Sequence, residues 1–189
     1  MAKLIYSMIT SLDGYMEDAD GKFDWSVPDE ESHNYITELE RSARTHLYGR
    51  RLYETMMVWE TDTSFIKDSP YMQSYADMWQ AADKIVYSRT LKAPSTRRTR
   101  LDRDFDVDTI RAMKAASDGE LAIGGIGLAS QAFRAGLVDE VNLFVAPVII
   151  GGGKRALPDD LYLELELVKT HPFQSGMVHL QYRVSRGAP

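Results

Sequence analysis

Residues 121–128 read LAIGGIGL, a short apolar run followed by a turn that contains three glycines. A helical pattern of apolar residues continues from the turn to Leu137, so the segment predicts a strand, a glycine turn and a helix. Backbone N–H groups in such a turn can approach an anion closely, because no Cβ atom holds the anion away. We therefore expect the turn to bind the pyrophosphate of a nucleotide. The alternative is a tight connection whose glycines serve only the path of the backbone.

The composition is that of an ordinary globular protein. The chain has 189 residues, of which 44% are hydrophobic and 26% charged, and we expect one domain over residues 1–189. Its net charge of −6 argues against a nucleic-acid partner, and its lack of cysteine excludes disulfides and thiol chemistry. No apolar run in the sequence is long enough to span a bilayer. We therefore expect a cytoplasmic protein with no membrane partner.

Strands and helices are expected to alternate along most of the chain. Strands are predicted at 4–9, 45–48, 84–88, 121–124 and 138–147, and helices at 28–43, 69–82 and 105–117. The spacing of Ser26 and Asp29 suits a capping box at the start of the first helix. Segments 161–168 and 177–184 alternate with period two, which is typical of an antiparallel hairpin with one exposed face. This order predicts an α/β fold with a mixed, mainly parallel sheet closed by a C-terminal antiparallel hairpin.

Two arginines follow the glycine that ends the strand at 45–48. Gly49, Arg50 and Arg51 open a predicted helix, and positive side chains at a helix N-terminus oppose the helix dipole. An anion is therefore expected to neutralise at least one of the two guanidinium groups. A surface salt bridge to an acidic neighbour would have the same effect.

Another strand end carries hydroxyl groups and a further guanidinium. Ser88, Arg89 and Thr90 lie where the strand at 84–88 ends. Side chains of this kind can hold the 2′-phosphate of a ribose. The other arginines nearby, between Arg97 and Arg103, are expected to form the solvated face of a loop.

The first loop and the first helix supply the candidate carboxylates. Asp13 precedes Gly14 after the first strand, where ligands of open α/β sheets bind, although an Asp before a Gly also suits a plain turn. Glu30 belongs to the acidic first turn of the helix, where such residues complement the helix dipole or one of them turns inward. Trp25, just before this helix, either walls a flat ligand or fills the core.

Several common active-site patterns are absent from the sequence. The four histidines are scattered without the spacing of a metal site, so we expect no metal. There is also no Gly-x-Ser-x-Gly elbow, which would carry the nucleophile of an α/β-hydrolase. Residues 151–154 read GGGK, but they lack the earlier glycine and the Ser or Thr of a Walker A motif. A Rossmann domain carries its glycine turn after the first strand, whereas the turn at 121–128 lies two-thirds along this chain.

A series of short motifs occurs in a distinctive order. They are SLDG at 11–14, WSVP at 25–28, GRRLYE at 49–54, SR at 88–89, IGGIG at 123–127, and Pro147 before GGG at 151–153. In order and spacing they resemble the dihydrofolate reductase-like superfamily, and most closely the reductase domain of bacterial bifunctional riboflavin-biosynthesis deaminase-reductases. The resemblance extends over nearly the whole chain and implies a three-layer α/β/α arrangement.

The resemblance implies an NADPH-dependent reductase whose cofactor lies across the strand ends. The pyrophosphate would be held by Gly124, Gly125, Ile126, Gly127 and Leu128. The adenosine 2′-phosphate would lie among Gly49, Arg50, Arg51, Ser88, Arg89 and Thr90. The nicotinamide would lie beside Ile9 and the loop that contains Asp13 and Gly14. One hydrogen bond to the cofactor is in question, because Leu52 stands where classical folate reductases have Thr.

By the same resemblance, a small-molecule substrate fills the space between the first loop and the helix after Trp25. Hydride would pass to a C=N or C=O bond of a pteridine- or aminopyrimidine-like compound, as in a 5-amino-6-(5-phosphoribosylamino)uracil reductase. The proton would come from Asp13 or Glu30, and we expect burial to raise the pKa of that carboxyl group toward neutrality. Asp13, Trp25 and Glu30 would also contact the substrate.

Two further hypotheses concern turnover and assembly. The same fold could serve as a nucleotide- or flavin-binding module that has lost its catalytic acid. The apolar, β-rich C-terminal part also suggests a homodimer, with the closing hairpin and the strand at 139–149 as its interface.

Overall fold

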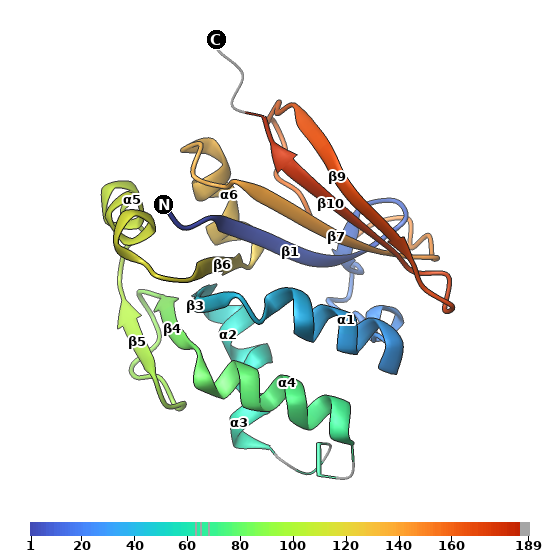
Figure 1. Cartoon of the computed structure of the whole chain (residues 1–189), viewed down its shortest axis with the longest axis horizontal. Coiled ribbons are helices and arrows are strands. Elements are labelled where there is room, and N and C mark those ends of the chain that lie inside the picture. The colour runs from blue at the N-terminus through green and yellow to red at the C-terminus, as the bar shows by residue number, and fades with distance from the viewer. Residues whose placement is uncertain (63, 65, 68, 186–189) are drawn as a thin grey trace.

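The centre of the molecule is an eight-stranded sheet with the order β5-β4-β3-β6-β1-β7-β10-β9 (Figure 1). The computed structural model describes residues 1–62, 64, 66–67 and 69–185. Its strands in this sheet are β1 (Leu4–Ser11), β3 (Ala43–Gly49), β4 (Asp83–Tyr87), β5 (Thr99–Asp102), β6 (Glu120–Gly124), β7 (Glu140–Ala146), β9 (Leu165–Pro172) and β10 (Val178–Val184). The strands from β5 to β7 in this order are parallel, and β10 is antiparallel to both of its neighbours. The predicted mixed sheet and its closing hairpin are confirmed.

Helices cover both faces of the sheet. They are α1 (Glu30–Glu40), α2 (Arg50–Met56), α3 (Val58–Thr61), α4 (Pro70–Ala81), α5 (Val107–Ala116) and α6 (Ile126–Arg134), with a short 3₁₀ turn, η1, at Asp24–Ser26. In Figure 1, α1 and α4 lie on one side of the sheet, and α5 and α6 lie on the other. The result is a three-layer arrangement with the sheet in the middle.

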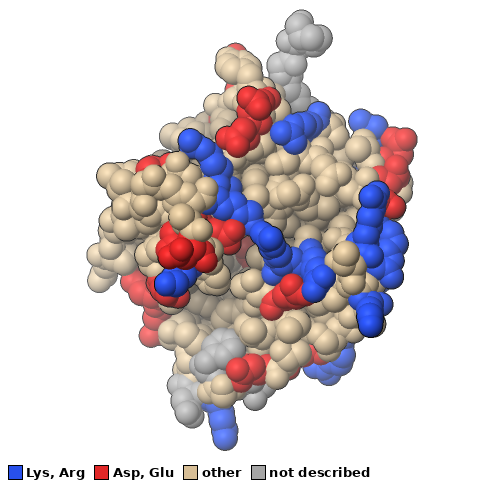
Figure 2. Space-filling model, turned by 180° about the vertical axis from the view of Figure 1, so that it is seen from behind, with Lys and Arg blue, Asp and Glu red and all other residues tan. Residues whose placement is uncertain are grey.

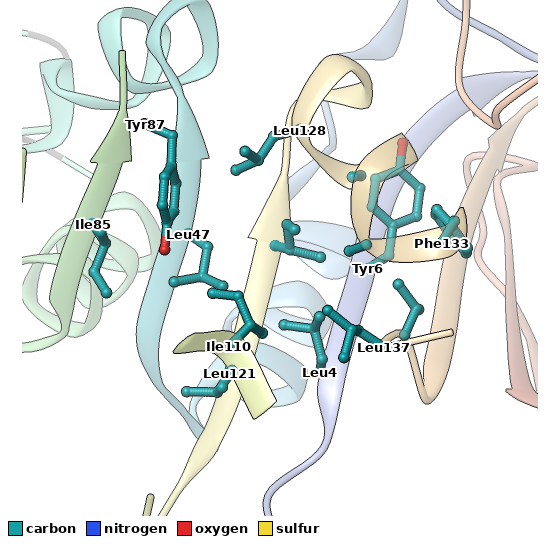
Figure 3. Close-up of a cluster of buried hydrophobic side chains, with 14 of the residues drawn as sticks. Leu4, Tyr6, Leu47, Ile85, Tyr87, Ile110, Leu121, Leu128, Phe133 and Leu137 are labelled. Carbon is teal, nitrogen blue, oxygen red and sulfur yellow. The ribbon is translucent and has the colours of Figure 1, made fainter. Parts of the chain in front are cut away.

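Strands β1, β3, β4 and β7 contribute to two separate hydrophobic clusters, because successive side chains point to opposite faces of a sheet. Leu47 of β3 and Leu121 of β6 pack with α5 and α6 in the cluster drawn in Figure 3. Tyr48 and Val86 belong instead to the cluster under α1 and α4, which has the fully buried Trp79 as its largest side chain. The apolar runs of the central strands follow from burial on both faces.

A small second sheet was not predicted. It pairs β2 (Tyr15–Glu17) with β8 (Lys154–Arg155) and so ties the loop after β1 to the loop after β7. Gly153 has φ +133, and a Cβ atom there would overlap the carbonyl oxygen of Glu17. The close approach of these two loops therefore requires glycine at this position.

The predicted start and end of the first helix were wrong. Asp29, not Ser26, caps α1, because its side chain accepts a 2.9 Å hydrogen bond from the Ser32 N–H. The helix ends at Glu40 rather than Ala43, since Ala43 already pairs with β6 as the first residue of β3.

Two strand predictions also differ from the structure. β9 begins at Leu165 rather than residue 161, because its partner β10 ends at Val184 opposite Leu165. Leu161 and Leu163 pack against the core without pairing, so their alternation reflects packing alone. β5, with the sequence TRLD, occupies part of the basic stretch that was expected to be a loop. Within the described part of the chain, no helix is both long enough and apolar enough to cross a membrane.

Candidate functional site

The carboxyl ends of β1, β3, β4 and β6 meet at a cleft of about 1080 Å³. Ile9, Gly49, Tyr87 and Gly125 each line the cleft from one of these strand ends. Figure 2 shows the molecule from behind, with a hollow near the centre of this face and Lys and Arg side chains beside it. The edge at which a doubly covered sheet binds its ligands is therefore open in this protein.

The glycine turn forms one wall of the cleft. Gly125 has φ +84 and caps the N-terminus of α6, and its carbonyl oxygen accepts from the N–H groups of Leu128 and Ala129. A Cβ atom at Gly127 would meet nothing within 4 Å, so a ligand can approach the backbone of the first helical turn. The cleft lining includes the predicted residues from Gly125 to Leu128.

Gly124 has a packing role. It lies behind the wall rather than in it, because it is absent from the lining and a Cβ atom there would overlap Cδ2 of Leu52. Leu52, where folate reductases have Thr, therefore packs against the glycine turn.

The three predicted arginines differ in how they are paired. Arg50 donates to Glu54 at 2.7 Å and to the Thr90 hydroxyl at 2.9 Å. Arg89 forms an ion pair with Asp104. For Arg50, the alternative of a surface salt bridge is realised. Arg51 lines the cleft and has no ion-pair partner within the described residues, so its charge is available to an anion.

Ser88 and Arg103 shape the strand end at β4. The Ser88 hydroxyl accepts from the Leu91 N–H at 3.0 Å and lines the cleft, whereas Thr90 does not line it. Arg103 was expected to be a solvated loop residue, but it lines the cleft and donates to the Ser88 and Leu91 carbonyls at 2.9 and 2.8 Å. Because β5 was not predicted, nothing in the sequence indicated that Arg103 would return to this edge.

Asp13 anchors a loop. Its carboxylate accepts from the Ile150 N–H at 3.2 Å and from the Gly151 N–H at 2.7 Å. A hydrogen bond from the Ser11 hydroxyl, together with these backbone N–H groups, lowers the pKa of Asp13. The expectation that burial would raise this pKa was wrong, because the carboxylate is hydrogen-bonded and accessible rather than desolvated. Asp13 and Gly14 lie outside the cleft lining.

Glu30 and Trp25 also lie outside the lining. Glu30 is exposed as the first residue of α1. Trp25 is partly buried and packs against the cluster under α1 and α4, which is the core-filling alternative. Its neighbours in the chain, among them Phe23 and Val27, line the cleft instead. The catalytic roles of Asp13 and Glu30 stay predictions.

Comparisons with known proteins show the family to which this chain belongs. The model of the RibD C-terminal domain matches residues 2–179, which is most of the chain. The chain belongs to the RibD C-terminal domain family. Over 184 residues it is 26% identical to YyaP, an uncharacterised protein of Bacillus subtilis (strain 168), covering 95% of this chain and 94% of YyaP.

Solved structures of similar proteins agree with the family. A candidate riboflavin biosynthesis protein from Shewanella sp. PV-4 is 25% identical, with a TM-score of 0.74 over 98% of this chain and 100% of that one. Dihydrofolate reductase from Enterococcus faecalis, complexed with NADP(H), has a TM-score of 0.61 at 16% identity over 96% of both chains. The RibD C-terminal domain described here therefore has the dihydrofolate reductase-like fold, of the type found in riboflavin-pathway reductases.

In this RibD C-terminal domain, one wall of the cleft is aromatic and was not predicted from the sequence. His33 of α1 lies between Trp59, Tyr71 and Tyr75, with ring centroids 5.7, 5.1 and 5.3 Å away. Burial lowers the pKa of His33, so the imidazole is neutral at pH 7. His33, Trp59, Met72 and Tyr75 line the cleft, although the helical spacing of Met72 and Tyr75 favours core packing over a ligand site.

A smaller cavity of about 170 Å³ adjoins the cleft and contains a buried polar network. The Tyr75 hydroxyl donates to Glu40 at 3.1 Å, and the Trp79 indole N–H donates to the Tyr48 hydroxyl at 3.1 Å. Burial raises the pKa of Glu40 to about 7 and lowers that of His46 to about 4. No group of His, Cys, Asp or Glu able to hold a metal ion occurs among the described residues.

Proposed function

We propose that this chain is an NADPH-dependent reductase that transfers hydride to a C=N or C=O bond of a pteridine- or aminopyrimidine-like small molecule. The observation that carries the proposal is the convergence of an open glycine turn and the unpaired Arg51 on one cleft at the strand ends. Membership of the RibD C-terminal domain family supports it. The choice of NADPH as cofactor is supported by Enterococcus faecalis dihydrofolate reductase, which has a similar fold and whose structure is complexed with NADP(H).

The described residues fit a dinucleotide phosphate. Gly125 to Leu128 offer backbone N–H groups at the start of α6 for the pyrophosphate, and the missing Cβ at Gly127 leaves room for it. Arg51 would pair with the 2′-phosphate beside Ser88, with Arg50 and Arg89 at the rim. When bound, the nicotinamide supplies the hydride. Ile9 would form the surface beneath its ring, at the end of the central strand.

Thermal unfolding with each nucleotide tests the cofactor. NADPH at about one hundred times its Kd is expected to stabilise the fold by roughly 2.7 kcal/mol. NADH should stabilise it less at the same concentration, because it lacks the 2′-phosphate. Arg51→Met should abolish the difference, whereas Arg44→Met, an exposed arginine paired with Asp118 outside the cleft, should retain it. Equal shifts with NADPH and NADH in the wild type would contradict the placement of the 2′-phosphate.

The two carboxylates are tested by pH profiles. Since its pKa is lowered, Asp13 is expected to act by holding the loop at Ile150 and Gly151. Asp13→Asn should therefore lower kcat/KM without moving the pH dependence of kcat. Glu30→Gln should leave the profile unchanged, because Glu30 is exposed outside the cleft. A profile that loses its decline toward high pH in either variant would instead identify that residue as the proton donor.

A binding module without turnover is the second candidate. It is favoured by the absence of both Asp13 and Glu30 from the described cleft lining. This candidate predicts a thermal shift with NADPH or a flavin, and no NADPH oxidation with pterins, folates or aminopyrimidines. Oxidation of NADPH that depends on any of these compounds would rule it out.

A further inference from the structure

The cleft has two chemically different ends. At the end formed by β3, β4 and β6, the lining contains Arg50, Arg51, Arg89 and Arg103. At the other end, the lining is dominated by apolar and aromatic side chains from the first loop and from α1 to α4. These are Met16, Phe23, Val27, Pro28, Ile36, Met56, Val58, Trp59, Met72 and Tyr75. If the cofactor takes the arginine end, as proposed above, the substrate meets the apolar end.

The charges at the apolar end cancel. Among the described lining residues there, the charged side chains are Glu17 and Lys154. They form a salt bridge with an N–O distance of 3.2 Å, and their side chains are only 24% and 32% exposed. The pair joins β2 to β8 in register, so the ribbon holds the two groups together. Lys154 is therefore committed to Glu17 and is not a free cation for a substrate.

The remaining titratable groups at this end, His33 and Tyr75, are neutral, because burial lowers the pKa of His33 and raises that of Tyr75. His33 is 7% exposed and enclosed by three aromatic rings, and burial lowers its pKa. An imidazole in this state offers hydrogen bonds and a flat face but no positive charge. A phosphate monoester placed here would lose its hydration without gaining a charged partner. A flat, uncharged ring would gain by burying its faces against the aromatic side chains.

We propose that the substrate of this protein is an uncharged, flat heterocycle without a phosphate group. The inference rests on the proposed reductase function and narrows it. The Thermotoga maritima protein of the same fold is named for a phosphoribosylamino substrate, so the proposal separates this chain from that activity. In the reaction, hydride from NADPH forms the new C–H bond, the C=N π electrons move to nitrogen, and water supplies the N–H proton. NADP⁺ leaves as the oxidised product.

Two matched pairs of compounds test the proposal. One pair is 7,8-dihydroneopterin and its phosphate monoester, and the other is 5-amino-6-ribosylaminouracil and its 5′-phosphate. Within each pair the reducible group is the same and only the phosphate differs. The wild-type protein is expected to oxidise NADPH with the uncharged member at a kcat/KM about 30-fold or more above that of the phosphate ester. Equal or preferred use of the phosphate esters would overturn the proposal.

Two variants test the same proposal by changing the charge of the cleft instead of the charge of the compound. Val27 lines the cleft mouth and is 67% exposed, so Val27→Lys adds a cation without disturbing the core. It should raise kcat/KM for the phosphate esters by about 2- to 5-fold and leave the uncharged members nearly unaffected. Lys154→Met should not weaken use of the phosphate esters selectively. A selective loss would mean that Lys154 leaves Glu17 to bind phosphate, which contradicts the proposal.

Failure of the reductase function has a different signature. If NADPH stabilises the protein but is oxidised with no member of either pair, the reductase proposal fails. The substrate class is then decided by binding, measured as the further thermal shift that each compound gives to the NADPH complex. Shifts with the uncharged members would support the inference. Shifts with the phosphate esters alone, or with none of the compounds, would overturn it.

Discussion

Glu40 ends α1 with its carboxyl group against the Tyr75 hydroxyl, in the cavity that also contains His46 and Tyr48. The carboxyl group gains a single side-chain hydrogen bond there and loses most of its hydration, so its pKa rises to about 7. The neighbouring His46 is neutral for the same reason, and so it does not stabilise a carboxylate. The fold therefore favours the protonated form of Glu40.

This preference predicts a loss of stability as pH rises. The folded-state pKa lies above the ordinary value of 4.5 for a glutamate, so the contribution of Glu40 is complete below about pH 4.5 and disappears as pH rises through about 7. Glu40→Gln keeps the shape without the charge, and it should exceed the wild type in free energy of unfolding by up to about 3 kcal/mol near pH 8. Urea denaturation between about pH 5 and pH 8 measures the difference.

The matched control is Glu38→Gln on the same helix. Glu38 is exposed and paired with Arg41, and this pairing lowers its pKa, so the variant should follow the pH dependence of the wild type above pH 5. Parallel curves for Glu40→Gln and the wild type would show that Glu40 is ionised in the folded protein.

At the scale of elements, two glycines in the turn between β6 and α6 are expected to have different roles, one in the stability of the fold and one in cofactor binding. Gly125 has φ +84, so Gly125→Ala should destabilise the fold by about 1–2 kcal/mol. Gly127 lies in the helix with open space beside it, so Gly127→Ala should stabilise the fold by about 0.5–1 kcal/mol. Its new methyl group would nevertheless stand where the pyrophosphate is proposed to bind. We expect a higher Tm and weaker NADPH binding, which thermal unfolding and fluorescence titration measure together.

A Gly127→Ala protein that is stabilised and binds NADPH as tightly as the wild type would contradict this placement of the pyrophosphate. A protein that is destabilised would contradict the helical position of Gly127.

Elements with their own burial pattern could be predicted from the sequence, and elements defined by their partners could not. β1, β6 and β7 carry continuous apolar runs because both of their faces are covered. β5 reads TRLD and β8 is two residues long, and each is a strand only because a neighbour pairs with it. Such pairing depends on residues far away in the chain.

The residues of the candidate site also differ in whether the local sequence was enough to predict them. The glycine turn and Arg51 were predicted, because glycine and arginine at strand ends are unusual enough to indicate a phosphate. The wall formed by Met72 and Tyr75 was not, because the same helical spacing serves a core or a cleft. The acid role expected of Asp13 depended on an environment that only the loop at Gly151 reveals.

At the scale of the whole molecule, β9 forms an open edge of the sheet (Figure 1). Its side chains Leu165, Leu167 and Val168 are 40%, 53% and 47% exposed. The strand at 139–149, also expected at an interface, cannot serve as one over β7, because Val141 and Phe144 are buried inside the sheet. We propose that the protein forms a homodimer through the β9 edge alone.

Leu167→Lys tests this interface. The wild type is expected to sediment as a dimer, and the variant as a monomer, because a charge on the edge opposes pairing of two sheets. Tyr162→Lys is the control, since Tyr162 is 83% exposed but lies outside β9. A wild-type monomer at all concentrations, or a Leu167→Lys dimer, would contradict the assignment. Analytical ultracentrifugation distinguishes these cases.

The central position of β1 has a consequence for the order of events during synthesis. The ribosome makes this strand before the other strands of the sheet, yet its neighbours are β6 and β7, and Leu4 pairs with Leu121. Until residues 120–124 have emerged, the nascent chain can pair β3 with β4 but must leave β1 without either neighbour. Sheets built from such distant segments form slowly and expose strand edges meanwhile. A ribosome stalled before β6 has emerged would therefore hold an aggregation-prone chain with no cleft.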